Sequence, residues 1–159
     1  MNRTTKPFNG YILTALISSV LTIASVQVKA SNDLTALGDL AGGSFYSYGV
    51  GVNSDGSVVV GVSNGTSGTE AFRWTQVYGM VGLGDLAGGV FSSTALGVNA
   101  DGSVVVGSST SINGREAFRW TQAGGMVGLG DLAGGSFEGS SAHAVNSDGS
   151  VVVGIGRGL

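Results

Sequence analysis

Two acidic side chains, Glu70 and Glu116, have the type and spacing closest to those of a catalytic pair. Each opens the same motif, EAFRWTQ, and the two motifs begin 46 residues apart. Glycoside hydrolysis requires two carboxyl groups roughly 5–10 Å apart. However, a residue that recurs at one place in a repeat more commonly performs the same structural task in each copy. No histidine stands near either motif to serve as a base, so we expect no enzymatic activity.

Three oxygen-rich turns are the next candidates for chemistry, because they resemble calcium loops. They contain Asp55-Gly56, Asp101-Gly102 and Asp148-Gly149, each within a DGSVVVG motif. An EF-type loop needs several carboxylates and a closing Glu, whereas each turn here has one carboxylate. Asn, Asp and Gly are the residues of tight hairpin turns. The chain has no Cys and a single His, His143, so we predict neither a metal nor a cofactor.

Aromatic side chains in the same motif could stack on sugars or fill a core. They are Phe72, Trp74, Phe118 and Trp120. Large aromatic side chains dominate the energetics of cores, so we expect these four to pack between neighbouring sheets.

Two polar stretches differ most between the copies and are candidate binding loops. They cover residues 64–69 and 110–115 and include Asn64, Thr66, Ile112 and Arg115. Variable loops on a fixed scaffold commonly carry binding specificity, here for a protein or a glycan. Relaxed constraint on exposed loops explains the variation equally well.

Internal repetition governs the sequence after residue 31. LGDLAGG begins at residues 37, 83 and 129, and DGSVVVG begins at residues 55, 101 and 148. The chain therefore holds two complete copies, 37–82 and 83–128, and a partial third copy, 129–159.

Each copy of about 46 residues has the pattern of four short antiparallel strands. A β-branched run such as Val58–Val60 follows each Asp-Gly turn, and EAFRWT alternates in the manner of a strand. No helical periodicity is present, so the region should be all-β. Four strands of this size match one β-propeller blade. The alternative is a β-solenoid, which the repeated hairpin turns disfavour.

Two and two-thirds copies cannot close a propeller ring, which needs about four to eight blades. We therefore predict an incomplete, propeller-like array whose end copies expose apolar faces. Either chains associate through these end copies, or the protein is a shortened relative of a longer one. The sequence VVVGIGRGL carries no capping segment after its central strand, which favours shortening.

The first thirty residues have the three parts of a secretory signal peptide. Arg3 and Lys6 precede an uncharged apolar run, 11–26, and small residues lead to a cleavage position between Ala30 and Ser31. The apolar run is shorter than the roughly 20 residues that span a bilayer, which disfavours the alternative of a retained anchor. We predict a signal helix in residues 1–30 and an exported β-repeat region in residues 31–159.

The charge of the exported region limits its partners. Only four basic residues remain after residue 30, against ten acidic ones, which gives a net charge of 4 − 10 = −6. Such a chain is unsuited to nucleic acid or to anionic lipid. We therefore expect no nucleic-acid partner and contact with a membrane only during export.

The motifs EAFRWT, GMVGLGDLAGG and GVNSDGSVVVG resemble those of the HAF-type extracellular repeat family of bacteria. The family is named for a His-Ala-Phe stretch, where this chain has Glu70-Ala71-Phe72 and Glu116-Ala117-Phe118. The resemblance covers nearly all of residues 31–159. Some members of the family are similar to passenger regions of autotransporters. The resemblance implies a secreted, cell-surface or outer-membrane location and a repeat scaffold, and it brings no catalytic residues.

The sequence thus favours a secreted or surface-exposed, non-enzymatic β-repeat protein that binds or adheres to a protein or glycan. One alternative is a secreted, glycan-active propeller enzyme that uses Glu70 and Glu116. The other is a gene fragment with no folded role.

The signal-peptide interpretation predicts the mass of the exported protein. We expect a mature chain that begins at Ser31, because Val28 and Ala30 satisfy the small-residue rule for cleavage. Intact-mass spectrometry of the exported protein measures this start, and a first residue well away from Ser31 would contradict the interpretation.

Overall fold

The computed structural model describes residues 34–132 and 139–156. This part of the chain consists of β-strands and turns without any helix, so the all-β prediction is confirmed. It follows that these residues include no helix long and apolar enough to cross a membrane. The predicted signal peptide of residues 1–30, with its cleavage position at Ala30 and Ser31, lies outside the described residues.

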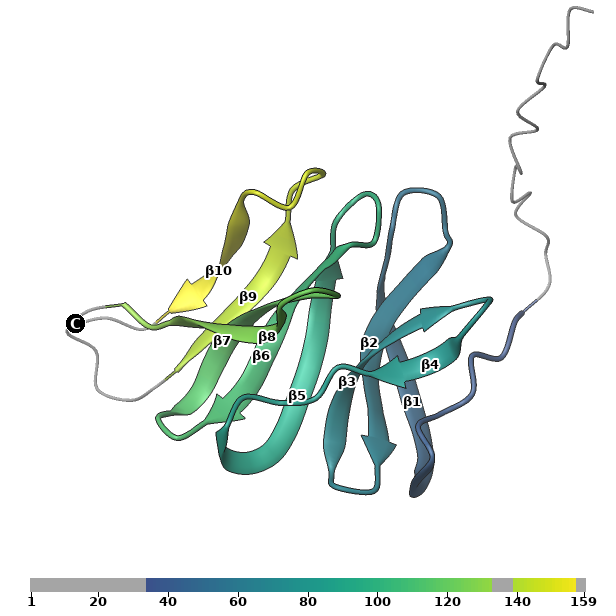
Figure 1. Cartoon of the computed structure of the whole chain (residues 1–159), viewed down its shortest axis with the longest axis horizontal. Coiled ribbons are helices and arrows are strands. Elements are labelled where there is room, and N and C mark those ends of the chain that lie inside the picture. The colour runs from purple at the N-terminus through teal and green to yellow at the C-terminus, as the bar shows by residue number, and fades with distance from the viewer. Residues whose placement is uncertain (1–33, 133–138, 157–159) are drawn as a thin grey trace, which may run out of the picture.

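Ten strands form three antiparallel groups, which we call the first, second and third units (Figure 1). The first unit contains β1 (Gly42–Val52), β2 (Val58–Gly65), β3 (Thr69–Thr75) and β4 (Gly79–Gly82). The second contains β5 (Gly88–Val98), β6 (Val104–Ser111), β7 (Gly114–Thr121) and β8 (Gly125–Gly130). The third contains β9 (Ser140–Val145) and β10 (Val152–Gly156).

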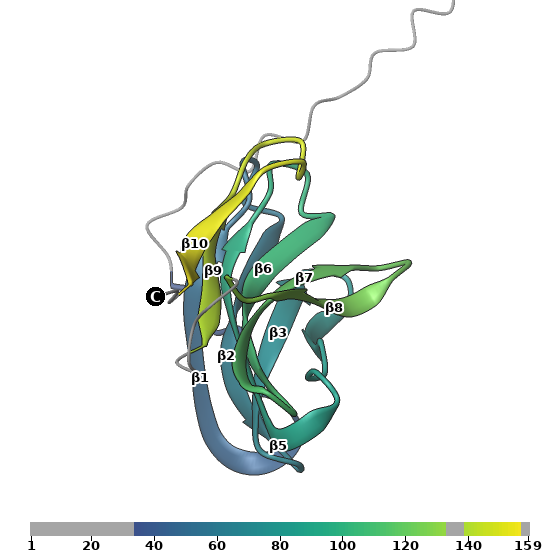
Figure 2. The ribbon, with the colours of Figure 1, turned by 90° about the vertical axis from the view of Figure 1, so that its left-hand side faces the viewer.

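The three units stand side by side along the longest axis of the molecule (Figure 1), so they overlap one behind another in the end-on view of Figure 2. One parallel bridge, between Thr69 and Ser92, links the first unit to the second. The described strands form an eight-stranded and a two-stranded sheet, and these residues do not close into a barrel or propeller.

The predicted hairpin turns are present between the first two strands of each unit. In the first turn, Asn53 Oδ1 accepts the Val58 N–H at 2.9 Å, and Asp55 Oδ1 accepts the Ser57 N–H at 2.9 Å. Gly56 has φ +76°, which only Gly adopts without strain. The chain therefore folds back at each Asp-Gly pair, and β1 and β5 run antiparallel to β2 and β6. This pairing does not fit the alternative solenoid.

Strand lengths differ from the sequence-based expectation. The AGGSF segment has the composition of a connector, but from Gly42 onward it lies within β1, because Gly42 pairs with Gly65 across the hairpin. The expected loops 64–69 and 110–115 are tighter, since their outer residues extend the flanking strands. The fourth strand ends at Gly82 in the first unit, whereas its equivalent in the second unit extends to Gly130.

Valine triplets pack the units against one another. Val58 and Val60 of the first unit join Val105 and Phe118 of the second in one buried cluster. Val104 and Val106, which flank Val105, point the other way and join a second cluster with Ala142 of the third unit. The alternation of a strand thus sends apolar groups to both faces of the second unit.

Serine hydroxyls connect successive units through buried hydrogen bonds. Ser93 Oγ accepts the Ala71 N–H of the preceding unit at 2.9 Å and donates to the Gly84 carbonyl oxygen. Ser140 makes the same pair of bonds with Ala117 and Gly130. These bonds satisfy buried backbone groups that would otherwise cost free energy.

Contact between units predicts unequal effects of alanine at two equivalent glycines, Gly56 and Gly102. Both have similar positive φ, but a Cβ on Gly102 would lie 2.5 Å from Val58 Cγ2, whereas a Cβ on Gly56 meets open space. Gly102→Ala should therefore lower the free energy of unfolding by about 1–3 kcal/mol more than Gly56→Ala. Urea unfolding of dilute protein measures both variants, and equal losses would contradict the packing described.

Candidate functional site

Two neighbouring grooves recur one unit apart on the same face of the molecule. The first is lined by the turn residues 55–57 together with Trp74 and Gln76. The second is lined by the equivalent turn residues 101–103 together with Trp120 and Gln122. An indole face, an amide and a carboxylate are groups that together suit a ligand with both apolar and hydroxyl-bearing surfaces.

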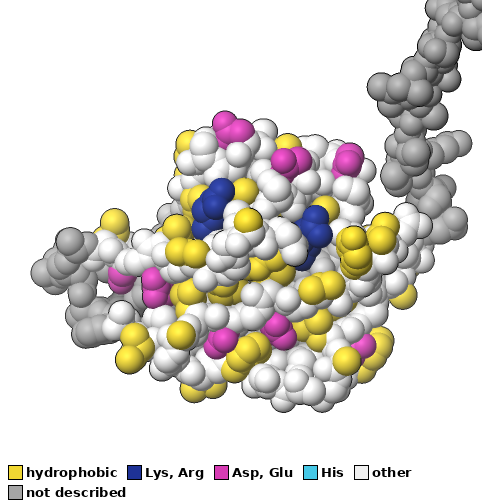
Figure 3. Space-filling view, in the orientation of Figure 1, with side chains coloured by type: hydrophobic (Ala, Val, Ile, Leu, Met, Phe, Trp, Pro, Cys, Tyr) yellow, Lys and Arg dark blue, Asp and Glu magenta, His cyan; other side chains and the backbone are white. Residues whose placement is uncertain are grey.

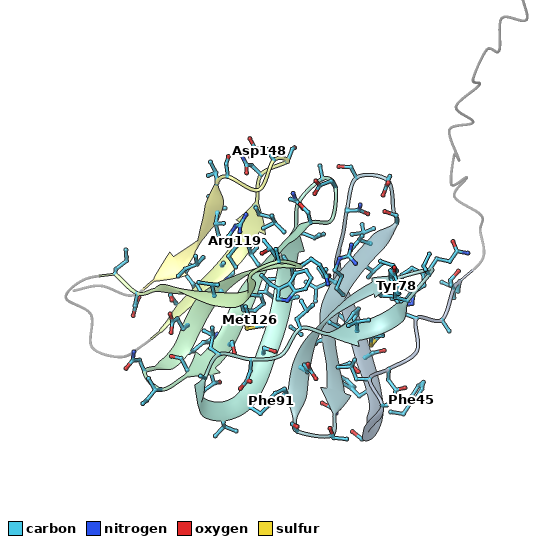
Figure 4. The ribbon with its side chains drawn as sticks, viewed as in Figure 1. Phe45, Tyr78, Phe91, Arg119, Met126 and Asp148 are labelled. Atoms are coloured by element: carbon cyan, nitrogen blue, oxygen red, sulfur yellow. The ribbon has the colours of Figure 1, made fainter. Side chains whose placement is uncertain are left out.

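Four residues line both grooves and so join them. Arg73, Thr75 and Tyr78 come from the first unit, and Asp101 comes from the turn of the second unit. Arg73 Nε donates to the Gly102 carbonyl oxygen at 3.1 Å, which fixes the guanidinium group between the grooves. Tyr78 lies at the tip of the β3–β4 hairpin, where its ring is largely exposed (Figure 4).

The four aromatic side chains of the repeated motif divide into two roles. Phe72 and Phe118 are fully buried. A Cβ on the cross-strand partner of each, Gly61 or Gly107, would lie within about 3 Å of the ring, so these glycines make room for the phenyl groups. Trp74 and Trp120 are only partly buried and line the grooves. Trp120 also packs against the buried cluster between the first and second units. The expected packing in the core is therefore found for Phe72, Phe118 and Trp120, whereas Trp74 lies in the first groove.

Exposed carboxylates are spaced along the top of the molecule (Figure 3), and two of them, Asp55 and Asp101, line the grooves. They belong to the turns, whose outermost member, Asp148, is labelled in Figure 4. The hydroxyl and backbone N–H of Ser103 hydrogen-bond to Asp101 and hold its pKa below the usual range. Ser57 and Ser150 lower the pKa of Asp55 and Asp148 in the same way. These turns are therefore anionic at neutral pH.

The two candidate catalytic carboxylates make the same contact, each within its own unit. Glu70 Oε1 accepts the Gly84 N–H at 2.9 Å, and Glu116 Oε1 accepts the Gly130 N–H at 3.0 Å. Neither side chain lines the two grooves. Glu70 fixes the loop that follows β4, and Glu116 fixes the end of β8, which is a repeated structural task.

The candidate variable residues lie at the opposite ends of the hairpins from the Asp-Gly turns. Asn64 Nδ2 donates to Ser44 Oγ at 2.8 Å, which ties it to β1, and Thr66 lies in the tight β2–β3 turn. Ile112 is exposed at the β6–β7 turn, and Arg115 lines a separate hollow with Glu116. The structure does not bring these residues to the two grooves.

Sequence reasoning missed the groove residues Tyr78, Gln76 and Gln122. The two glutamines were visible as the last letter of each EAFRWTQ motif. Their shared position beside a tryptophan was the available signal. The described residues include no group of three His, Asp or Glu side chains that could hold a metal ion.

Comparisons of this chain with protein-family models, curated proteins and solved structures find no match.

The hydrogen bonds at the turns predict an acid-dependent part of the stability. A carboxylate whose pKa is lowered by folding stabilises the fold at neutral pH, and this contribution is lost as the pH falls through the lowered pKa. Asp101→Asn should therefore weaken the dependence of the unfolding midpoint on pH in the acid range. Urea unfolding at a series of pH values measures this, with Asp131→Asn as the control because Asp131 lies outside the Asp-Gly turns. An unchanged pH profile for Asp101→Asn would contradict the role of Ser103.

Proposed function

We propose that this protein is an exported, non-enzymatic scaffold that binds neutral glycans at the bacterial surface or in the surrounding medium. The observation that carries the proposal is the pair of equivalent grooves, each with a partly exposed tryptophan beside an amide and an anionic turn.

A glycan suits the grooves for two reasons. Sugar rings present an apolar face that packs on an indole and a rim of hydroxyls that bond to amides and carboxylates. A polysaccharide also repeats along its length, as the grooves do. Arg73 and Tyr78, which line both grooves, give neighbouring sugar residues a continuous surface.

The charge of the turns supports a neutral ligand. Asp55 and Asp101 are ionised at neutral pH because their pKa values are lowered. The region after residue 30 also has a net charge of 4 − 10 = −6. Sulfated or carboxylated sugars would be repelled.

The proposed architecture is an incomplete, propeller-like array of repeats. The first strands of successive units lie beside one another, since β5 contacts both β1 and β9, as inner strands do in a propeller. The resemblance to HAF-type repeats and the signal pattern of residues 1–30 support export to the cell surface. They also support a relationship to longer, autotransporter-like proteins.

A glycan-active enzyme is the competing function. The engagement of Glu70 and Glu116 with backbone N–H groups outside the grooves favours binding over hydrolysis. Release of reducing sugar from polysaccharides that is abolished by Glu70→Gln and Glu116→Gln would instead establish hydrolysis. A chain without a folded role would lack the circular dichroism of a β-sheet protein.

The proposal predicts that the tryptophans carry the binding energy. Trp74→Ala and Trp120→Ala should each weaken binding of a neutral oligosaccharide at least about tenfold, because truncation of a central aromatic contact typically costs more than about 1–2 kcal/mol. Isothermal titration with neutral oligosaccharides identified on a glycan array measures the effect.

Phe45→Ala is the matched control for the tryptophan variants. Phe45 is exposed and lies at the lower edge of β1, away from the grooves (Figure 4), so its removal should leave affinity unchanged. Absence of any bound glycan on the array, or equal losses for all three variants, would overturn the proposed function.

A further inference from the structure

Equivalent residues on the forward face of the units, the face turned toward the next unit, differ sharply in exposure. Val58 in the first unit is 3% exposed and Val104 in the second is 4% exposed, because the next unit covers each of them. The equivalent residue of the third unit, Val151, is 54% exposed. Val153 and Ile155 of β10 are also exposed. The forward face of the third unit is thus an apolar surface without a cover among the described residues.

On the backward face, which is turned toward the preceding unit, the exposed residues are those of the first unit. Ser93 and Ala95 of β5 are buried against the first unit. The equivalent residues of β1, Ser47 and Gly49, are exposed. Val52, the equivalent of the partly buried Val98, is 60% exposed. Figure 3 shows that apolar side chains reach the surface at both ends of the long axis.

The hydrogen bonds between the Asp-Gly turns also run in one direction along the units. The Ser54 N–H donates to the Ala100 carbonyl oxygen at 3.3 Å, and the Ala100 N–H donates to the Ser147 carbonyl oxygen at 3.2 Å. Each bond runs from one turn to the next. Gly149 lies against Val104 just as Gly102 lies against Val58, whereas Gly56 of the first turn faces open space.

We propose that the chain associates head to tail, with the forward face of the third unit in one copy packed on β1 and the first turn of another copy. In this contact Val151 of one copy lies over Gly56 of the next, as Val58 lies over Gly102 within the chain. The Ser147 N–H donates to the Ser54 carbonyl oxygen of that next copy.

A second copy is the occupant that fits because the two exposed surfaces are the two halves of one contact. The chain forms that contact twice internally, with valine, glycine and turn residues of the same types at the same positions. The third unit provides β9 and β10 but no described third strand, so the contact is smaller than the internal ones and should depend on concentration. Different patches meet across it, and association can therefore continue beyond a dimer. This inference does not rest on glycan binding.

Sedimentation velocity of the purified full chain over a wide range of concentration tests the proposal. We expect the mean mass to rise with concentration. Val151→Asp and Val52→Asp should each raise the dissociation constant by about tenfold or more, since a charge would be buried without a partner. An equimolar mixture of the two variants should form dimers and nothing larger, because it has one intact forward face and one intact backward face.

Val127→Asp is the matched control, since Val127 is 55% exposed but lies on β8, outside both faces. It should associate like the unaltered chain. Three results would overturn the proposal: a monomer at every concentration, association that either face variant leaves intact, or a mixture that stays monomeric. The first would be the outcome if residues 1–33 cover these faces, or if their natural occupant is a protein other than this chain. Circular dichroism confirms that each variant folds.

Discussion

No four-stranded unit in this protein can bury its own apolar faces, and the whole structure depends on the contact that solves this problem. Val58 and Val60 of one unit are withdrawn from water only because Val105 and Phe118 of the next unit lie against them. At about 25 cal/mol per Å² of apolar surface, this burial is the main source of stability for such thin sheets. The serine bonds and the ladder of turns then fix how far one unit is displaced from the next.

The sequence was sufficient to predict features that depend on local chemistry. Asp55-Gly56 and its equivalents specify hairpin turns because Gly adopts positive φ and Asp accepts the N–H of the residue two positions on. The valine triplets specify strands buried on both faces, since an exposed sheet face would alternate with polar residues. The all-β class and the orientation of the first hairpin in each unit follow from these two signals.

The remaining features depend on contacts between residues distant in sequence. Phe72 and Trp74 occupy the same face of β3, and nothing in the motif separates them. Phe72 lies opposite Gly61 and is buried, whereas Trp74 lies beside the turn residues and lines a groove. Likewise, AGGSF has the composition of a connector. Most of it lies in a strand because Gly42 pairs with Gly65 across a long hairpin. Tyr78 became a groove residue through the placement of the β3–β4 hairpin beside the next unit's turn.

The interchangeability of the inter-unit contact has a genetic consequence. A unit with the same valines, serines and turn can follow any other unit, so in-frame duplication or loss of one 46-residue stretch needs no compensating mutation elsewhere. Neighbouring copies that share most of their residues are also expected to be substrates for unequal recombination in the coding DNA. The number of units should therefore vary between related proteins more readily than the sequence of each unit. The length of the molecule would then change faster in evolution than its fold.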